Sequence, residues 1–184
     1  MQLISKIVFI LISTFCCVLY ANDFERSNIV PTMQSPSNLK ITLITGDTVS
    51  YEKNSTSTFR VYEKGSSKLV QHKSLSINGQ LYLIPLKAQP LINLNILDQE
   101  FFNINKLVNY ELDDASSSLY PILIKYKSPF SQANLITNAS AITYEKIRTQ
   151  YIELKKSELV QTWAEITKNL TIEKINLDEK INHH

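Results

Sequence analysis

The chain has 184 residues, of which 43% are apolar, and its formal charge is +2 at neutral pH. This length and apolar content are enough for a hydrophobic core, so extended disorder is not expected. The charge is too near zero, and the basic residues are too scattered, for nucleic acid or an anionic membrane to be the partner. Both cysteines, Cys16 and Cys17, lie near the N-terminus. The rest of the chain therefore has no disulfide and no cysteine-based site.

The first 21 residues have the layout of a secretory signal peptide. Lys6 supplies positive charge, residues 7–20 form an uncharged apolar stretch, and Ala21 is the small residue at the expected cleavage point. The apolar stretch is shorter than the about 20 residues of a membrane-spanning helix, although an uncleaved N-terminal anchor remains the alternative. We therefore expect a mature protein that begins at Asn22 and is secreted, to the periplasm or outside the cell, with no membrane attachment beyond the signal peptide.

The next segments predict a β-rich unit. Residues 22–38 are polar and contain two prolines, which predicts a flexible leader. Apolar and polar residues alternate through residues 39–84, which predicts a small antiparallel sheet of four or five strands. Gly46 and the Asn78-Gly79 pair fall between alternating runs, where glycine supplies the backbone conformation that hairpin turns need.

Short helices and a loop are expected to complete this unit. Apolar residues recur at three-to-four spacing in residues 86–95 and 99–110, which is typical of helices. Residues 113–118 are polar and predict a loop. Asp113 and Asp114 in this loop are expected to cap backbone groups or to be solvated, and not to form a catalytic carboxylate pair.

A second unit is expected to follow from residue 120. Residues 120–126 predict a strand, residues 140–154 two further strands, and residues 170–177 a last strand. Between them, Ser157 is expected to be the N-cap of a helix whose apolar stripe includes Trp163. This order of elements predicts a small split α/β sandwich with a helix on one face. The predicted fold class is therefore α+β, with a β-rich subdomain over residues 39–119 and an inhibitor-like α/β subdomain with a C-terminal tail over residues 120–184.

Seven short phrases carry a family resemblance. The matching stretches are residues 41–49 (ITLITGDTV), Gly79, Tyr82, Ile84 and Pro85, then Leu97, Asp98, Phe102, Ile104 and Leu107, and finally residues 112–115 (LDDA), 120–126 (YPILIKY), 162–167 (TWAEIT) and 174–181 (KINLDEKI). In this order and spacing they resemble the N-terminal pro-region of large secreted bacterial subtilisin-like serine proteases. Leu112 stands where the family has an aromatic residue, and Glu179 where it has a glycine.

The resemblance implies a non-catalytic role. The family's protease domain would follow the pro-region, and none of its motifs occurs in this sequence. We therefore expect a secreted protein, monomeric when free, that acts in trans as an inhibitor or folding chaperone of a subtilisin-like serine protease encoded by a neighbouring frame. Two alternatives remain: a truncated or split protease remnant, and an extracellular interaction module with no protease target.

In related prodomains the sheet packs on the protease and the C-terminal tail lies in the substrate cleft like a product. The resemblance thus places protease contacts on the last strand and the tail. A frayed tail is the alternative. The expected contact residues are Ile175, Leu177, Asp178, Lys180, Ile181 and His184.

No cofactor, metal site or catalytic residue is expected. His72 lies in a strand-like stretch with no nucleophile beside it. His183 and His184 are adjacent, and neighbouring residues seldom converge on one ion. No serine has the glycine-flanked setting of a nucleophile elbow.

Overall fold

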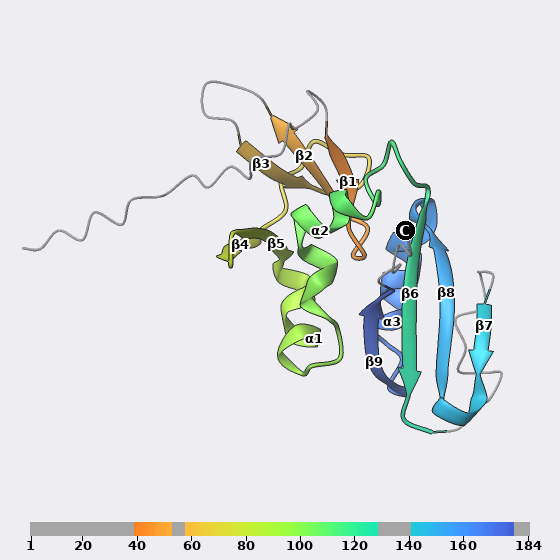
Figure 1. Cartoon of the computed structure of the whole chain (residues 1–184). Helices are drawn as coiled ribbons and strands as arrows, with labels where there is room; N and C mark the ends of the chain where they lie inside the picture. The colour runs from red at the N-terminus through yellow and green to blue at the C-terminus, as the bar shows by residue number, and fades with distance from the viewer. Residues whose placement is uncertain (1–38, 53–57, 129–140, 179–184) are drawn as a thin grey trace, which may run out of the picture.

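Figure 1 shows the computed structural model of the chain, which describes residues 39–52, 58–128 and 141–178. Within these ranges the fold is α+β, as the sequence predicts, with antiparallel sheets and a few short helices. The segments expected to form a signal peptide and a leader, and residues 179–184, fall outside the described residues, so the predictions made for them stay predictions.

The first unit contains five strands in two antiparallel sheets. The strands are β1 (Lys40–Thr42), β2 (Thr48–Glu52), β3 (Thr58–Tyr62), β4 (His72–Ile77) and β5 (Gln80–Pro85). The sequence predicted one sheet, but no ladder joins β3 to β4 among the described residues: an isolated bridge links Tyr62 at the end of β3 to Leu69, which precedes β4. The predicted turn between β4 and β5 is confirmed: Asn78 and Gly79 have φ angles of 50° and 75°, the left-handed pair of a tight hairpin.

Short helices follow β5 where the apolar spacing predicted them. They are 3-10 turns over Leu86–Ala88 and Gln99–Phe102, α1 (Gln89–Asn93) and α2 (Ile104–Asn109). Side chains cap the N-termini of the Gln99–Phe102 turn and of α2. Asp98 accepts a hydrogen bond from Glu100 N at 3.1 Å, and Asn103 accepts one from Lys106 N at 3.0 Å. These caps satisfy helix N–H groups that would otherwise lack partners.

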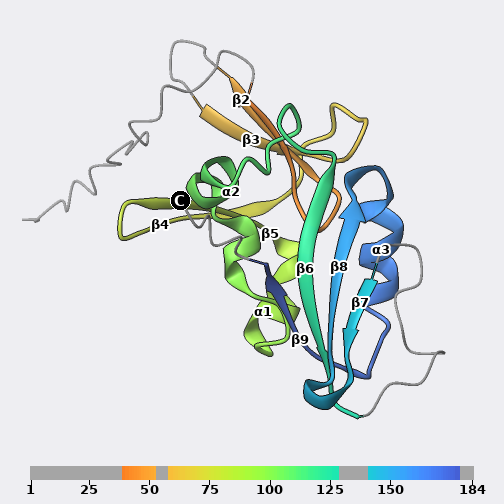
Figure 2. The same ribbon diagram turned by 45° about the vertical axis from the view of Figure 1, so that its right-hand side comes forward.

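The second unit is a four-stranded antiparallel sheet in the order β7-β8-β6-β9. Its elements are β6 (Leu119–Tyr126), β7 (Ala141–Tyr144), a 3-10 turn (Glu145–Ile147), β8 (Thr149–Lys155), a 3-10 turn (Lys156–Glu158), α3 (Leu159–Ile166) and β9 (Ile172–Leu177). Because β8 and β9 both pair antiparallel with β6, they run parallel to each other on either side of it. The β8-α3-β9 connection is thus a split β-α-β unit, and α3 covers one face of the sheet (Figures 1 and 2).

The expected N-cap of α3 is wrong by one residue. Glu158 occupies the N-cap position, and no side chain caps the helix. Ser157 instead lies inside the 3-10 turn that leads into α3. This turn already adopts helical geometry, so Ser157 is one residue too early to act as the cap.

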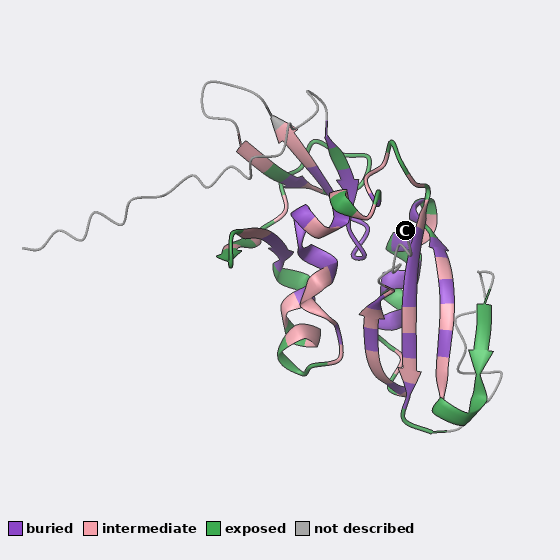
Figure 3. Cartoon of the chain, viewed as in Figure 1, coloured by how far each residue is buried: buried purple, intermediate pink, exposed green. Residues whose placement is uncertain are grey.

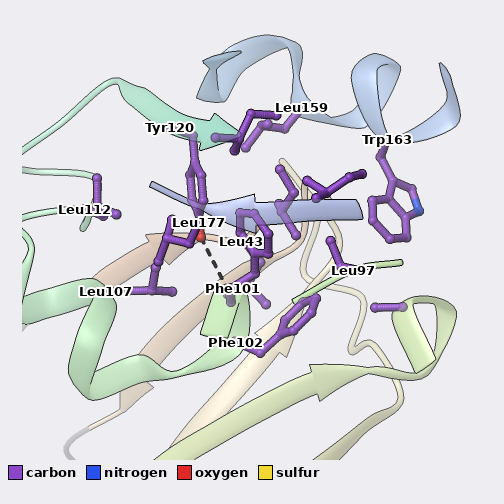
Figure 4. Close-up of a cluster of buried hydrophobic side chains, with 14 of the residues drawn as sticks. Leu43, Leu97, Phe101, Phe102, Leu107, Leu112, Tyr120, Leu159, Trp163 and Leu177 are labelled. Atoms are coloured by element: carbon purple, nitrogen blue, oxygen red, sulfur yellow. Dashed lines mark hydrogen bonds between the residues drawn. The ribbon is translucent and has the colours of Figure 1, made fainter. Parts of the chain in front are cut away.

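One hydrophobic core joins the two units (Figures 3 and 4). The ring of Phe101 stacks on that of Tyr120 with centroids 5.9 Å apart, and the Tyr120 hydroxyl donates to Phe101 O at 3.4 Å. Trp163 of α3, predicted as a core residue, is 8% exposed and lies near Leu97 of the first unit. Burial of Tyr120 raises the pKa of its hydroxyl well above the usual range.

Candidate functional site

The strand expected to contact a protease, β9, is an edge strand of the four-stranded sheet. Its Ile175 and Leu177 side chains are buried in the core, at 0% and 4% exposure. Contacts of these two residues with a partner are therefore limited to their backbone. Asp178 continues the pairing one residue further, since its N–H donates to Pro121 O at 3.2 Å. Lys180, Ile181 and His184, also expected to contact the protease, lie outside the described residues.

The first unit occupies part of the β9 edge. Ile175 N donates to Ile96 O at 2.7 Å, and Asp98 N donates to Ile175 O at 2.9 Å. Leu97, between these two residues, forms a parallel bridge with Ile175. Both backbone groups that Ile175 turns away from β6 are thus already bonded. A partner strand cannot add to β9 at this residue. No local pattern in the sequence indicates this contact, because the partners are about 80 positions apart.

The sheet face opposite α3, which we call the outer face, carries the side chains that alternate with the core residues. Core-side residues such as Ile122, Ile124 and Ile152 are fully buried. No helix or strand of the described chain covers the outer face in Figure 1. By strand register it comprises Leu119, Pro121, Leu123, Lys125, Ile142, Tyr144, Thr149, Tyr151, Glu153, Lys155, Lys174, Asn176 and Asp178.

The centre of the outer face is apolar. Ile142, Tyr151 and Leu123 lie opposite one another on β7, β8 and β6 and form a continuous row. Ile142 is 55% exposed, and Tyr144 on the next row is 47% exposed. Exposed apolar side chains at adjacent sheet positions, unlike isolated ones, are typical of an interaction surface.

The two ends of the outer face carry opposite charge. Glu153 and Asp178 lie on either side of Pro121 towards one end. Lys125 and Lys174 are cross-strand neighbours on β6 and β9 towards the other end. The Tyr151 hydroxyl points to the acidic end and donates to Glu153 Oε1 at 2.8 Å. Partial burial, this hydrogen bond and the nearby carboxylates of Glu153 and Asp178 raise the pKa of Tyr151 to about 12.

An ion pair between the buried Lys156 and the half-buried Asp114 links the two units. Lys156 Nζ lies 3.0 Å from Asp114 Oδ1 and donates to Leu112 O at 2.6 Å. The two carboxylate oxygens of Asp114 also accept hydrogen bonds from Thr42 N and Thr42 Oγ1, each at 2.8 Å. Burial lowers the pKa of Lys156, and the Asp114 carboxylate opposes that shift. A polar hollow of about 300 Å³ lies beside this pair, and Lys64 on its wall donates to the carbonyls of Lys156 and Ser157.

Sequence reasoning found only part of this network. Asp113 caps the loop as predicted, accepting hydrogen bonds from Ala115 N and Ser116 N. The pairing of Asp114 with Lys156 was missed. A usable signal exists, because Lys156 continues the core-side positions 152 and 154 of β8, where a lysine needs a buried partner.

Among the residues that the structure describes, the other chemistry-bearing side chains form no further cluster. His72 lies in β4, with its Nδ1 3.0 Å from Val70 O. In the described ranges no group of three or more His, Cys, Asp and Glu side chains is placed to hold a metal ion. In the same ranges no helix combines the length and apolar character needed to cross a membrane.

Comparison with family models, with curated proteins and with solved structures finds no match to this chain.

Proposed function

We propose that the chain is a secreted, non-catalytic, prodomain-like protein that acts in trans on a subtilisin-like serine protease, as an inhibitor, a folding chaperone or both. The observation that supports this is the second unit, a four-stranded antiparallel sheet with α3 on one face and an outer face that no described helix or strand covers. The resemblance implies that the corresponding sheet packs on the protease. An apolar row at the centre of the outer face, with Ile142 exposed and Tyr151 and Leu123 half-buried, suits that role.

The position of β9 supports a role for the tail. Asp178 is still hydrogen-bonded to β6, and the Ile96–Asp98 segment holds Ile175, so the residues after Asp178 leave from a fixed corner of the sheet. A tail that starts from a fixed point loses less conformational freedom when it binds. In a substrate cleft such a tail would bind by strand addition, with main-chain hydrogen bonds giving affinity and side-chain pockets giving specificity.

Folding assistance would follow from the same contacts. A protein that binds the native protease and not the unfolded chain stabilises the native state by mass action. The outer face would provide this preference, because a sheet face packs on a folded surface that an unfolded chain does not present. Inhibition and chaperoning are therefore two consequences of one docking mode.

The test uses residues 22–184, the mature chain expected from the sequence, titrated into secreted subtilisin-like proteases. We expect inhibition, and a higher refolding yield when the denatured protease is diluted in its presence. Removal of residues 179–184 is expected to weaken inhibition at least about tenfold, since the strand-addition contacts are lost. A matched control replaces these six residues by glycine and serine, which keeps the length but removes the side chains.

The outcomes separate the parts of the proposal. Absence of both inhibition at micromolar excess and any gain in refolding yield would overturn it as a whole. Inhibition that survives tail removal would refute the tail-in-cleft mode and leave docking by the outer face. Inhibition that survives the glycine-serine control but not the truncation would assign the affinity to the main chain.

A further inference from the structure

The outer face is complementary to itself. Its acidic end carries Glu153 and Asp178, and its basic end carries Lys125 and Lys174. Alternate residues on a strand are about 6.6 Å apart, so the two charged rows lie at equal distances on either side of the apolar row. A half-turn about that row therefore exchanges the positions of the acidic and basic ends.

We propose that two copies of the chain associate through their outer faces, about a two-fold axis that runs along the apolar row and across the strands. In this arrangement Ile142, Tyr151 and Leu123 of each copy pack against the same residues of the other. The acidic row of each copy lies over the basic row of its partner. Such a self-complementary patch is what a closed two-fold interface requires.

The charges near each end preserve this complementarity. At the basic end, Lys125 bonds to Glu173 at 2.7 Å and Arg148 lies 3.8 Å from the same carboxylate. Lys174 donates to the neutral Asn95 Oδ1, so this end keeps an excess of positive charge. Lys125 and Glu173 keep side-chain exposures of 43% and 38%, which leaves them accessible to a second copy. At the acidic end, Lys155 is engaged by Glu158 at 3.3 Å and does not cancel the two carboxylates.

The size of the face predicts a weak dimer. Four strands about 4.8 Å apart and three outward rows give a contact on the order of 400 Å² per copy. Stable interfaces bury roughly 800 Å² per partner. We therefore expect a dissociation constant in the range of roughly tens to hundreds of micromolar, increasing with salt.

This inference does not rest on the proposed function, because it needs no protease. It differs from the monomer expected from the sequence. If the chain both dimerises and docks on a protease, the two equilibria are linked, because the dimer covers the outer face that would pack on the protease. Self-association and docking would then exclude each other, and the protease would draw monomer from the dimer.

The test is sedimentation velocity on residues 22–184 over a concentration series at low salt. One variant carries Glu153→Lys and Asp178→Lys, which makes both ends basic. The other carries Lys125→Glu and Lys174→Glu, which makes both ends acidic. We expect the unsubstituted chain to dimerise, each variant alone to lose at least about tenfold in affinity, and their equimolar mixture to form a heterodimer.

Two further variants keep the test independent of folding. Leu123→Glu, at the centre of the apolar row, should abolish the dimer with the thermal unfolding curve retained. Leu94→Glu, an exposed leucine of the first unit (68%), should leave the dimer unchanged. A chain that stays monomeric at all concentrations overturns the proposal. The proposal is also overturned if the charge-reversal variants still dimerise as tightly as the unsubstituted chain, or if their equimolar mixture forms no heterodimer. In either case association would use another surface, such as the β7 edge.

Discussion

Gly46 is a residue of the first unit that packs closely against α3 of the second. It has a φ of 80°, and a Cβ placed on it would lie 2.5 Å from Val160 Cγ2 and 3.0 Å from Val160 N at the start of α3. The turn itself is fixed by Asp47, which accepts a hydrogen bond from Thr45 Oγ1 at 2.7 Å and one from Lys87 Nζ at 2.9 Å. The Thr-Gly-Asp phrase of the sequence therefore forms a rigid turn packed against α3.

We predict that Gly46→Ala destabilises the fold much more than Gly79→Ala. Both glycines have positive φ, so each substitution incurs the left-handed penalty of about 1 kcal/mol. Only at Gly46 does the new methyl group also meet packed backbone, which raises the expected loss to about 3 kcal/mol. Urea unfolding midpoints measure both variants. Equal losses would mean that the turn can withdraw from α3 without cost.

For single residues, the sequence predicts the roles that depend on adjacent positions in the chain. Gly46 and the Asn78-Gly79 pair were recognised as turns because their chemistry is local. The partner of Lys156 was not, because Asp114 is 42 positions away and approaches only when the sheet has formed. Burial of a side chain can be inferred from strand alternation, but the identity of the group that it meets cannot.

Among the described elements, β9 is an edge strand that has a second backbone neighbour at Ile175. Ile175 pairs with β6 on one side and with Ile96 and Asp98 on the other. The strand was predicted from its alternation, which the structure confirms over Ile172–Leu177. Its second neighbour is a loop segment without periodicity, so no pattern in the sequence marked it.

We predict that Asp98→Pro loosens this edge. Asp98 has φ −69° and ψ 134°, which proline adopts without strain, so the substitution removes the N–H that bonds to Ile175 O and the side-chain cap. The expected loss is about 2 kcal/mol, with faster amide exchange at Ile175. Asp98→Ala is the matched control, since it removes the cap but keeps the N–H. Similar exchange at Ile175 in both variants would show that the bond does not hold the strand.

For the whole molecule, the sequence predicted two subdomains divided near residue 119. The elements of both were largely predicted, since each has its own periodicity. What the pattern could not show is that the apolar faces of both units contribute to one core, with Phe101 stacked on Tyr120. Apolar periodicity indicates which side of an element is buried and carries no information on what covers it.

The shared core leads to a prediction about cooperativity. Residues 39–118 and 119–184, expressed separately, would each expose the side chains that meet at the junction, including Leu97, Tyr120 and Ile175. We expect neither fragment to show a cooperative unfolding transition and the intact chain to show a single one. The fluorescence of Trp163, the only tryptophan, reports on the junction because the ring is 8% exposed. An equimolar mixture of the fragments should recover the buried tryptophan signal, because the same apolar surfaces then meet. A sharp transition in residues 119–184 alone would show instead that the sheet and α3 fold without the first unit.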